Sequence, residues 1–211
     1  MSKFRKAEKV EPPFYMFVYD ILVDPSLISY LLTGDSSPKT VQKMIDNKIW
    51  AAYIRGFRRR FSKASKTFGI VLTLEHTGST GDEVWGAVVQ VDNMDELNNL
   101  LRLYDFDYEF WYLEEVYYPD GSVSDGYTII PSSEEARPDL PHCLYIARLC
   151  AGANFWDRRV RGYKWKFFKN LYNKDGIPIL ATSCRCYLTD YTGAETEIQC
   201  TCEVDGFNCK L

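Results

Sequence analysis

The sequence of 211 residues is poor in histidine and has no long hydrophobic run. Its two histidines, His76 and His142, have no supporting motif for a catalytic triad, and we interpret both as exposed loop residues. No apolar stretch is long enough to cross a bilayer, and the first residues lack the apolar centre of a secretion signal. We therefore expect a cytoplasmic protein with no membrane partner.

The short motifs of the commonest enzyme classes are also missing. There is no phosphate-binding glycine loop, dinucleotide fingerprint, nucleophile elbow or H-E-x-x-H zinc motif. A net charge of −4 argues against nucleic acid as the main partner. An enzyme built from this sequence would work without a cofactor, through carboxylates, tyrosines and backbone amides.

Cysteine is absent before residue 143, and five of the seven cysteines lie in the last 28 residues. They form two C-x-C pairs, Cys184 with Cys186 and Cys200 with Cys202, followed by Cys209. Structural zinc sites usually have C-x-x-C spacing, so we predict reduced, partly buried thiols and no metal. Zinc is the second interpretation, and disulfides, which need an oxidising compartment, are the third.

What the sequence contains is typical of a packed globular protein, with 46% hydrophobic and 15% aromatic residues. We predict a flexible lead-in over residues 1–12, a single domain over 13–172 and a Cys-rich C-terminal extension over 173–211. The extension is interpreted as an appended hairpin-like segment and not as an independent domain.

Hydrophobic patterning predicts an α+β fold, with a mostly antiparallel, partly closed β-barrel or sheet and a few packed helices. Strands are expected at 14–19, 49–61, 68–74, 84–91, 112–118 and 143–149. The stretch 76–82 suits a hairpin between the third and fourth of these strands. Helices are expected at 25–32, 39–48, 94–104 and 154–171. The run Arg58-Arg59-Arg60 is interpreted as a solvated face, and Tyr104 as part of an aromatic pocket wall.

The first clear strand runs into a helix through the short loop Tyr19-Asp20-Ile21-Leu22. Asp24 is a good N-cap for that helix, and Pro25 suits its first position. Turns of this kind often present backbone N–H groups to a ligand and usually contain glycine. This loop has Asp20 instead, and aspartate tolerates a positive φ better than most residues if the position demands one.

Four motifs in order resemble the gamma-glutamylcyclotransferase-like family. The loop is similar to the family's Y-G-[ST]-x-L opening, which can continue as Y-G-T-L-M-D-P. Ile54-Arg55-Gly56-Phe57 is similar to its x-x-G-[YF] strand, and Val84-Trp85-Gly86-Ala87-Val88 to its V-x-G-x-x-[YW] strand. The segment 97–105 is similar to its helix end, L-x-x-L-D-x-x-E. The resemblance covers about residues 14–170 and leaves the Cys-rich extension unexplained.

The resemblance implies an enzyme that acts on a small molecule without a cofactor. Members cyclise a γ-glutamyl amide: the substrate's α-amino group attacks its γ-carbonyl, 5-oxoproline closes and an amine leaves. A helix-end Glu is the general base and then the general acid, and N–H groups of the loop bind the α-carboxylate. Carried over by position, Asp105 is the catalytic residue. The substrate-binding residues are Tyr19, Asp20, Ile21, Leu22 and Tyr112.

Two of these positions depart from the family pattern. Asp105 is one methylene shorter than glutamate, which displaces its carboxylate. The charge of Asp20 would repel a γ-glutamyl carboxylate unless a cation intervenes. We therefore predict either release of 5-oxoproline or acid–base catalysis on a redirected substrate such as a specialised metabolite, with Asp20 facing Asp105 as a substitute acid or base. The alternative is a catalytically silent ligand-binding or interaction module. No oligomeric state is predicted.

Overall fold

A computed structural model describes residues 4–132, 141, 143–169, 171–172, 181–189 and 195–203, the last three ranges and residue 143 by their backbone only. The strands are β1 (Phe4–Lys6), β2 (Phe14–Val18), β3 (Ile49–Arg55), β4 (Phe57–Ser65), β5 (Gly69–His76), β6 (Glu83–Val91), β7 (Tyr108–Tyr117), β8 (Val123–Pro131), β9 (Leu171–Tyr172), β10 (Ala181–Thr189) and β11 (Glu195–Glu203). The helices are the 3₁₀ turn η1 (Ile21–Val23) and α1 (Pro25–Thr33), α2 (Pro38–Asn47), α3 (Met94–Leu101), α4 (Cys143–Asp157) and α5 (Tyr163–Lys169).

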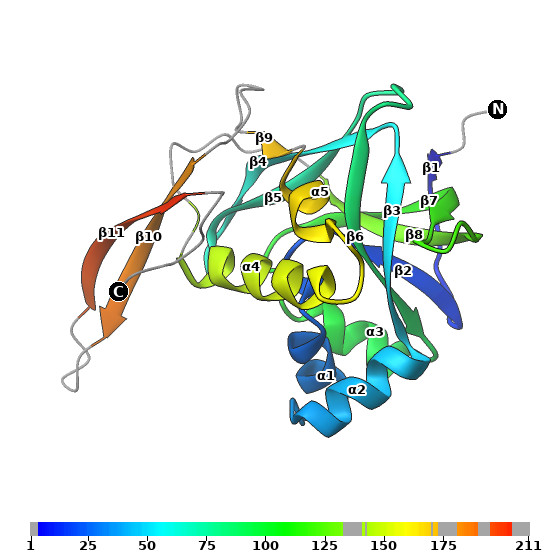
Figure 1. Ribbon diagram of the computed structural model, residues 1–211, viewed down its shortest axis with the longest axis horizontal. Helices are drawn as coiled ribbons and strands as arrows, with labels where there is room; N and C mark the ends of the chain where they lie inside the picture. The colour runs from blue at the N-terminus through cyan, green and yellow to red at the C-terminus, as the bar shows by residue number, and fades with distance from the viewer. Residues whose placement is uncertain are drawn as a thin grey trace.

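Five strands close into a ring in the order β7-β3-β6-β2-β8, because β8 pairs back onto β7 (Figure 1). The pairings in the ring are antiparallel except that of β2 with β8, which is parallel with Met16 opposite Tyr127. The short strand β1 adds to β7, so part of the expected flexible lead-in is paired. The predicted α+β fold with a mostly antiparallel, partly closed barrel is confirmed.

A second sheet consists of β5, β4 and β9. In it β5 pairs with β4 in an antiparallel hairpin, and β9 pairs with β4 in parallel. The predicted hairpin over 76–82 is therefore wrong, since β5 turns back onto the preceding strand and not onto β6. In the extension, β10 and β11 pair antiparallel, with Cys184 opposite Cys200.

The helices begin where capping chemistry predicts. Asp24 accepts a hydrogen bond from the backbone N of Ser26 (3.0 Å) at the start of α1, and Asn93 accepts one from Glu96 N (3.0 Å) at the start of α3. Helices α1, α2 and α3 gather below the strands, while α4 and α5 lie together on one side (Figure 1). No helix among the described residues combines the length and the apolar character that a membrane span requires.

The C-terminal part of the domain differs from the sequence prediction. The expected strand at 143–149 is the first half of α4, and the expected helix at 154–171 is the end of α4 followed by α5. The two helices separate around Gly162, which has φ +74°. The buried side chains of α4 show why: Tyr145, Ile146, Leu149, Ala153 and Trp156 recur at helical spacing and form its core-facing side.

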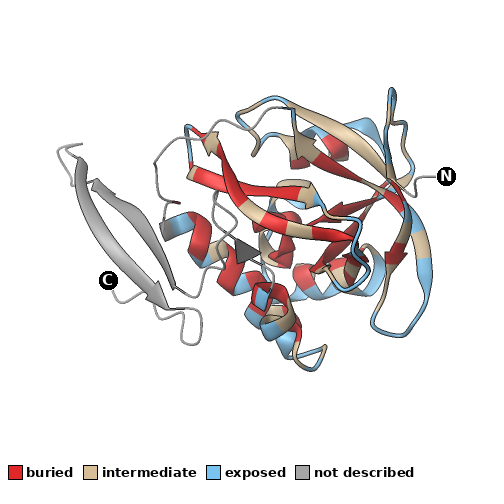
Figure 2. Cartoon of the chain, turned by 90° about the horizontal axis from the view of Figure 1, so that it is seen from above, coloured by how far each residue is buried: buried red, intermediate tan, exposed pale blue. Residues whose placement is uncertain are grey.

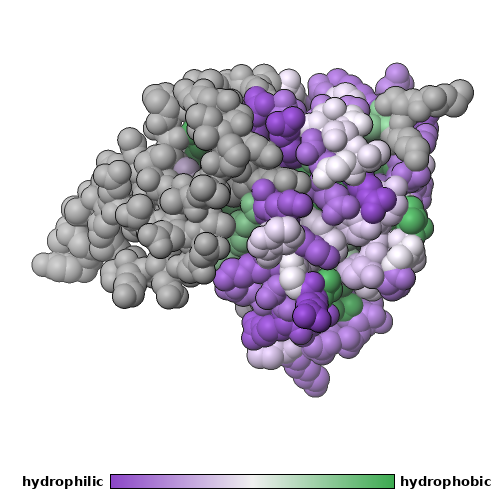
Figure 3. Space-filling model, turned by 45° about the horizontal axis from the view of Figure 1, so that its top comes forward, coloured by the Kyte–Doolittle hydropathy of each residue, from purple (hydrophilic) through white to green (hydrophobic). Residues whose placement is uncertain are grey.

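Buried residues concentrate in the strands and on the inner faces of the helices, while exposed residues lie in the loops and on the outer faces of the helices (Figure 2). The face shown in Figure 3 is mainly hydrophilic where the structure describes it, with hydrophobic residues in small groups. The large exposed hydrophobic side chains come from different elements: Tyr15, Tyr30, Met94, Val123, Leu144 and Trp165. Single exposed apolar residues of this kind are normal and do not mark an interface.

Helix α4 packs directly against the loop between β2 and α1. A Cβ added to Gly152 would lie 2.7 Å from Asp24 N and 2.6 Å from Val23 Cγ2. The side chain of Trp156, one turn later, donates from Nε1 to Val23 O (3.0 Å). Glycine at 152 therefore sets how closely α4 holds this loop.

Gly152→Ala is expected to lower the free energy of unfolding by about 1–3 kcal/mol, because the extra methyl overpacks the contact between α4 and the loop. Urea unfolding measures the change, with Ala151→Ser on the exposed side of the same helix as the control. A stability of Gly152→Ala equal to that of the wild-type protein would contradict this close packing.

Candidate functional site

The loop after β2 is shaped by the side chain of Asp20. Asp20 is the N-cap of η1, and its Oδ1 accepts a hydrogen bond from Leu22 N (3.0 Å). Its main-chain O accepts a second one from Val23 N (3.0 Å). The backbone φ of Asp20 is −111°, so the loop reaches this shape without the conformational freedom of glycine.

Tyr104, three residues beyond the end of α3, closes the loop. Its hydroxyl donates to Asp20 Oδ2 at 2.6 Å, a short bond of the kind expected for a phenol and a carboxylate. Asp20 is only 5% exposed, and both of its carboxylate oxygens are now engaged. The carboxylate is therefore the link between η1 and the end of α3.

Burial dominates the protonation of this pair. Desolvation raises the pKa of Asp20, and the hydrogen bonds from Tyr104 and Leu22 oppose the shift without cancelling it. The pKa of Tyr104 is raised well above its ordinary value by burial and then by the charge of Asp20. Tyr104 therefore keeps its proton near neutral pH and acts as the donor.

A buried arginine lies behind the loop. Arg59 on β4 is fully buried, and its Nη1 donates to Tyr19 O at 3.3 Å. Its guanidinium carbon lies 3.9 Å from the ring centroid of Phe167 on α5, within cation–π range. Desolvation lowers the pKa of Arg59 to about 10, which leaves it protonated near neutral pH. The sequence analysis left open whether a cation lies near Asp20, and Arg59 is a cation close enough to lower the pKa of that carboxyl.

The prediction of a solvated face for Arg58-Arg59-Arg60 is therefore wrong for its middle member. Arg58 and Arg60 point the other way and pair with Glu75 on β5. Strand alternation already carried the signal, since Arg59 shares its face with the buried Phe57 and Phe61. The run of three charges indicated exposure for all three arginines, whereas the alternation of the strand correctly indicates that Arg59 is buried.

The cavity beside Asp20 is almost closed. Its volume is about 10 Å³, which is at the lower limit for holding one water molecule. Aromatic and aliphatic side chains fill the space around the carboxylate. The lining residues are Asp20, Ile21, Phe68, Val71, Leu103, Tyr104, Phe106 and Tyr145.

Asp105 lies outside this cavity. Its exposed carboxylate accepts hydrogen bonds at Oδ2 from the backbone N (2.8 Å) and the hydroxyl (3.0 Å) of Thr67. Partial burial would raise the pKa of Asp105, but the hydrogen bonds from Ser65 and Thr67 lower it overall. These contacts are those of a residue that fixes the turn between β4 and β5. A catalytic role for Asp105 stays a prediction.

Tyr112 is also apart from the loop. Its hydroxyl donates to Asp125 Oδ2 (2.9 Å), and the guanidinium of Arg5 lies 5.1 Å from its ring centroid. The structure thus brings Tyr19 to Leu22 together in one buried turn, with Tyr104 and Arg59 added, and leaves Asp105 and Tyr112 elsewhere.

No cluster of three or more potential metal ligands occurs among the residues whose side chains are described. Within that part of the chain Cys150 is a buried cysteine. The side chains of the C-x-C cysteines lie outside the described residues, so their predicted state stays a prediction.

The closed ring, the hairpin of β4 and β5 and the helix-bearing loop after β2 together define a gamma-glutamylcyclotransferase-like fold, as the sequence led us to expect. No family model and no curated protein match the sequence. Among solved structures, the uncharacterized protein loc79017 from Homo sapiens is similar, with a TM-score of 0.51 and 21% identity over 67% of this chain and 79% of that one.

YkqA from Bacillus subtilis is similar with a TM-score of 0.50 and 17% identity, over 69% of this chain and 49% of YkqA. A gamma-glutamyl cyclotransferase matches with a TM-score of 0.49 and 21% identity, over 72% of this chain and 85% of that one. At these identities the likeness to loc79017 and YkqA concerns the fold.

Asp20→Asn is expected to change the pH dependence of stability. The raised pKa means that the Asp20 carboxyl binds its proton more tightly in the folded state than in the unfolded state. In the wild-type protein, tighter proton binding by Asp20 stabilises the folded state at low pH. This stabilisation is lost as the pH rises from the unfolded pKa through the folded pKa. Relative to the wild type, the free energy of unfolding of Asp20→Asn should rise over that range.

Asp105→Asn is the matched comparison and should show the opposite sign. The pKa of Asp105 is lowered, so its stabilising contribution is present above the unfolded pKa and is lost as the pH falls through the folded pKa. Asp105→Asn should thus lose relative stability as the pH rises. Urea unfolding in steps over roughly pH 3 to 8 measures both differences. Slopes of the same sign would contradict the contrasting environments of the two carboxylates.

Proposed function

We propose that this chain is a ligand-binding or interaction module on the gamma-glutamylcyclotransferase-like fold, and not an enzyme that releases 5-oxoproline from γ-glutamyl compounds. The observation that carries this proposal is the position of the Asp20 carboxylate, held between Leu22 N and the Tyr104 hydroxyl. A small molecule is the expected ligand. The cytoplasmic location and the limits of the domain, 13–172, are parts of the same proposal.

In the family that the sequence resembles, N–H groups of this loop are expected to bind the substrate's α-carboxylate. Here the Leu22 N–H already donates to a carboxylate that belongs to the chain itself. An intramolecular partner has an effective concentration far above that of a free ligand. A γ-glutamyl carboxylate would have to displace it and would then lie beside a like charge.

The space beside the loop supports the same conclusion. Small-molecule sites usually have volumes of roughly 300–1,000 Å³, whereas the cavity at Asp20 holds about 10 Å³. A substrate could enter only if Tyr104, Phe68 or Phe106 moved away. The side chains that close the site are packed into the domain's hydrophobic core or against it.

The acid–base chemistry is also incomplete. The side chain at the end of α3 that faces the loop is Tyr104, and its raised pKa makes it a poor general base near neutral pH. Asp105 is held at the Thr67 turn and does not line the cavity. The loop and the helix end therefore meet, as the resemblance implies, but through a phenol and a carboxylate that bind one another.

One observation favours a second candidate, an acid–base enzyme with a redirected substrate. A buried carboxyl with a raised pKa next to a phenol and a cation is a common arrangement for a general acid or base. In that case Asp20 would carry the proton transfer after Tyr104 had moved aside. The two candidates differ in whether Asp20 is needed for turnover.

Incubation of the purified protein with γ-glutamyl amino acids and with glutathione is expected to yield no 5-oxoproline above background. Asp20→Gly should gain binding of a γ-glutamyl dipeptide by about tenfold in calorimetry, because the Leu22 N–H becomes available for the ligand carboxylate. Asp107→Asn, an exposed carboxylate near the end of α3, is the matched control and should bind as the wild type does.

Release of 5-oxoproline by the wild-type protein would contradict the proposal. If that activity were lost in Asp20→Asn and kept in Asp107→Asn, the acid–base enzyme would be the better account. Failure of Asp20→Gly to gain binding, in a folded protein, would show that self-occupation of the loop is not what excludes the ligand.

A further inference from the structure

The corner where α4 ends and α5 begins is strongly basic. Residues 154–169 contain six lysines or arginines and a single acid, although the chain as a whole has a net charge of −4. The rest of the chain is therefore more acidic than the whole. The two helices pack against each other, and α5 also packs on β6 (Figure 1). We call this surface the basic corner, and its cations are Arg158, Arg159, Arg161, Lys164, Lys166 and Lys169.

Aromatic anchors hold the basic corner to the core of the domain. Trp156 and Tyr163 are buried, and their polar atoms donate hydrogen bonds of 3.0 and 2.7 Å to main-chain oxygens. The three arginines between these anchors are exposed. Asp157 fixes the turn, because its Oδ1 accepts a hydrogen bond from Lys164 N (2.9 Å). The cations are thus displayed by an anchored segment, which lowers the entropic cost of binding a partner.

The positive charge of the basic corner is not matched by acidic side chains. None of its six cations forms a salt bridge with a side chain that the structure describes. Cations elsewhere in the domain are paired: Lys48 contacts both Asp92 and Glu96, and Arg148 contacts Asp24. The basic corner is therefore a local excess of positive charge on an acidic protein.

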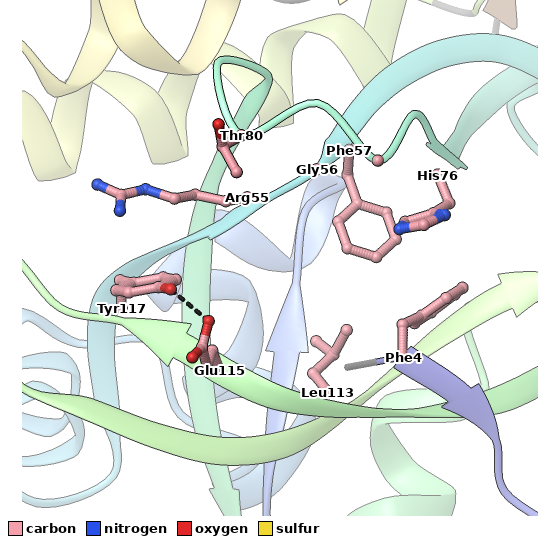
Figure 4. Close-up of a pocket in the computed structure, with 10 residues that line it drawn as sticks. Phe4, Arg55, Gly56, Phe57, His76, Thr80, Leu113, Glu115 and Tyr117 are labelled. Atoms are coloured by element: carbon pink, nitrogen blue, oxygen red, sulfur yellow. Dashed lines mark hydrogen bonds between the residues drawn. The ribbon is translucent and has the colours of Figure 1, made fainter. Parts of the chain in front are cut away.

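One side of the basic corner rests on a row of stacked rings. Tyr53 on β3 lies between Tyr117 on β7 and Trp85 on β6, with ring centroids 5.2 and 4.7 Å away, and Lys166 Nζ lies 4.3 Å from the Trp85 ring centroid. Figure 4 shows the far end of this row, where Tyr117 and Arg55 lie side by side at a cavity of about 380 Å³. The sheet thus fixes Lys166 by a cation–π contact.

An exposed indole ring lies among these charges. Trp165 on α5 is 64% exposed, and Lys169 Nζ lies 5.0 Å from its ring centroid. A single exposed ring is ordinary, but here it is surrounded in sequence by cations without acidic partners. Tryptophan and arginine are the residues that most often dominate the energy of protein–protein interfaces. The basic corner combines both.

An acidic protein segment suits this surface better than a long polyanion. At physiological ionic strength the Debye length is about 8 Å, so a bound group interacts mainly with the charges directly beneath it. A nucleic acid or an anionic membrane would extend past the basic corner, over a chain whose remaining charge is net negative. A short acidic peptide ends within the positive surface and avoids this repulsion.

We infer that the basic corner docks an acidic segment of a partner protein. Carboxylates of the segment pair with Arg158, Arg161 and Lys164, and an aromatic side chain of the segment packs on Trp165. The inference goes beyond the proposed function, because no residue of the basic corner lines the cavity at Asp20. It holds whether or not the Asp20 loop receives a small molecule.

Fluorescence anisotropy with the full chain tests the docking. The probe is a fluorescein-labelled peptide of repeated Asp-Glu-Glu-Phe units, and a peptide with Asn and Gln in place of the acids is its neutral control. The acidic peptide should bind about tenfold more tightly than the neutral one. Combined Arg161→Gln and Lys164→Gln should remove about that tenfold advantage. Combined Lys66→Gln and Arg102→Gln, which removes two exposed cations on other parts of the chain, should stay within about twofold of the wild type.

The ring contact has its own test. Trp165→Ala should weaken the Phe-containing acidic peptide by about fivefold and leave a peptide with Ala in place of Phe within about twofold. Tyr30→Ala, which removes another exposed ring, on α1, is the matched control and should bind both peptides as the wild type does.

Equal binding of the neutral peptide, unchanged affinity in either basic-corner variant, or equal losses in the two charge variants would overturn the inference. Tighter binding of a single-stranded oligonucleotide or of phosphatidylserine vesicles than of the acidic peptide would also overturn it, in favour of the other class of partner.

Discussion

The two hydrogen bonds that the Asp20 carboxylate accepts connect the loop after β2 with the end of α3. One bond, from Leu22 N, sets the turn η1, and the other, from Tyr104, draws the helix end over it. Helix α4 then covers the same loop, because Gly152 allows its backbone to approach Val23 and Asp24. The position of the Asp20 side chain therefore sets the loop conformation and closes the cavity, and α4 packs onto the loop in that conformation.

Electrostatics explain why such a buried carboxylate is tolerated. Its own hydrogen bonds satisfy both oxygens, and the guanidinium of Arg59 lies behind Tyr19 as a buried positive charge. Opposite charges in a region of low dielectric attract strongly, but each also loses its hydration, so the net stabilisation from such a pair is small. The main effect of the Asp20 and Arg59 charges is therefore to fix the conformation of the loop, and their contribution to the free energy of unfolding is small.

Much of this arrangement was readable from the sequence. Capping chemistry at Asp24 and Asn93 placed α1 and α3, and short ordered motifs predicted the fold. The rest depended on tertiary contacts. Tyr104 and Asp105 both lie beyond α3, which ends at Leu101, and their side chains make different contacts, with Asp20 and with Thr67. A motif that locates this segment only to within one residue therefore cannot tell Tyr104 from Asp105. Arg59 was missed because a run of charges was weighed more heavily than strand alternation. The strand predicted at 143–149 failed because apolar runs of this length also suit a buried helix.

The ¹³Cγ chemical shift of Asp20, followed against pH by NMR in the full chain, tests the central claim most directly. The account predicts a titration midpoint above the ordinary aspartate value of 3.8, with the Leu22 amide proton shifting at the same midpoint as its acceptor gains charge. A midpoint at or below that value, with a Leu22 amide signal that does not follow it, would contradict the account.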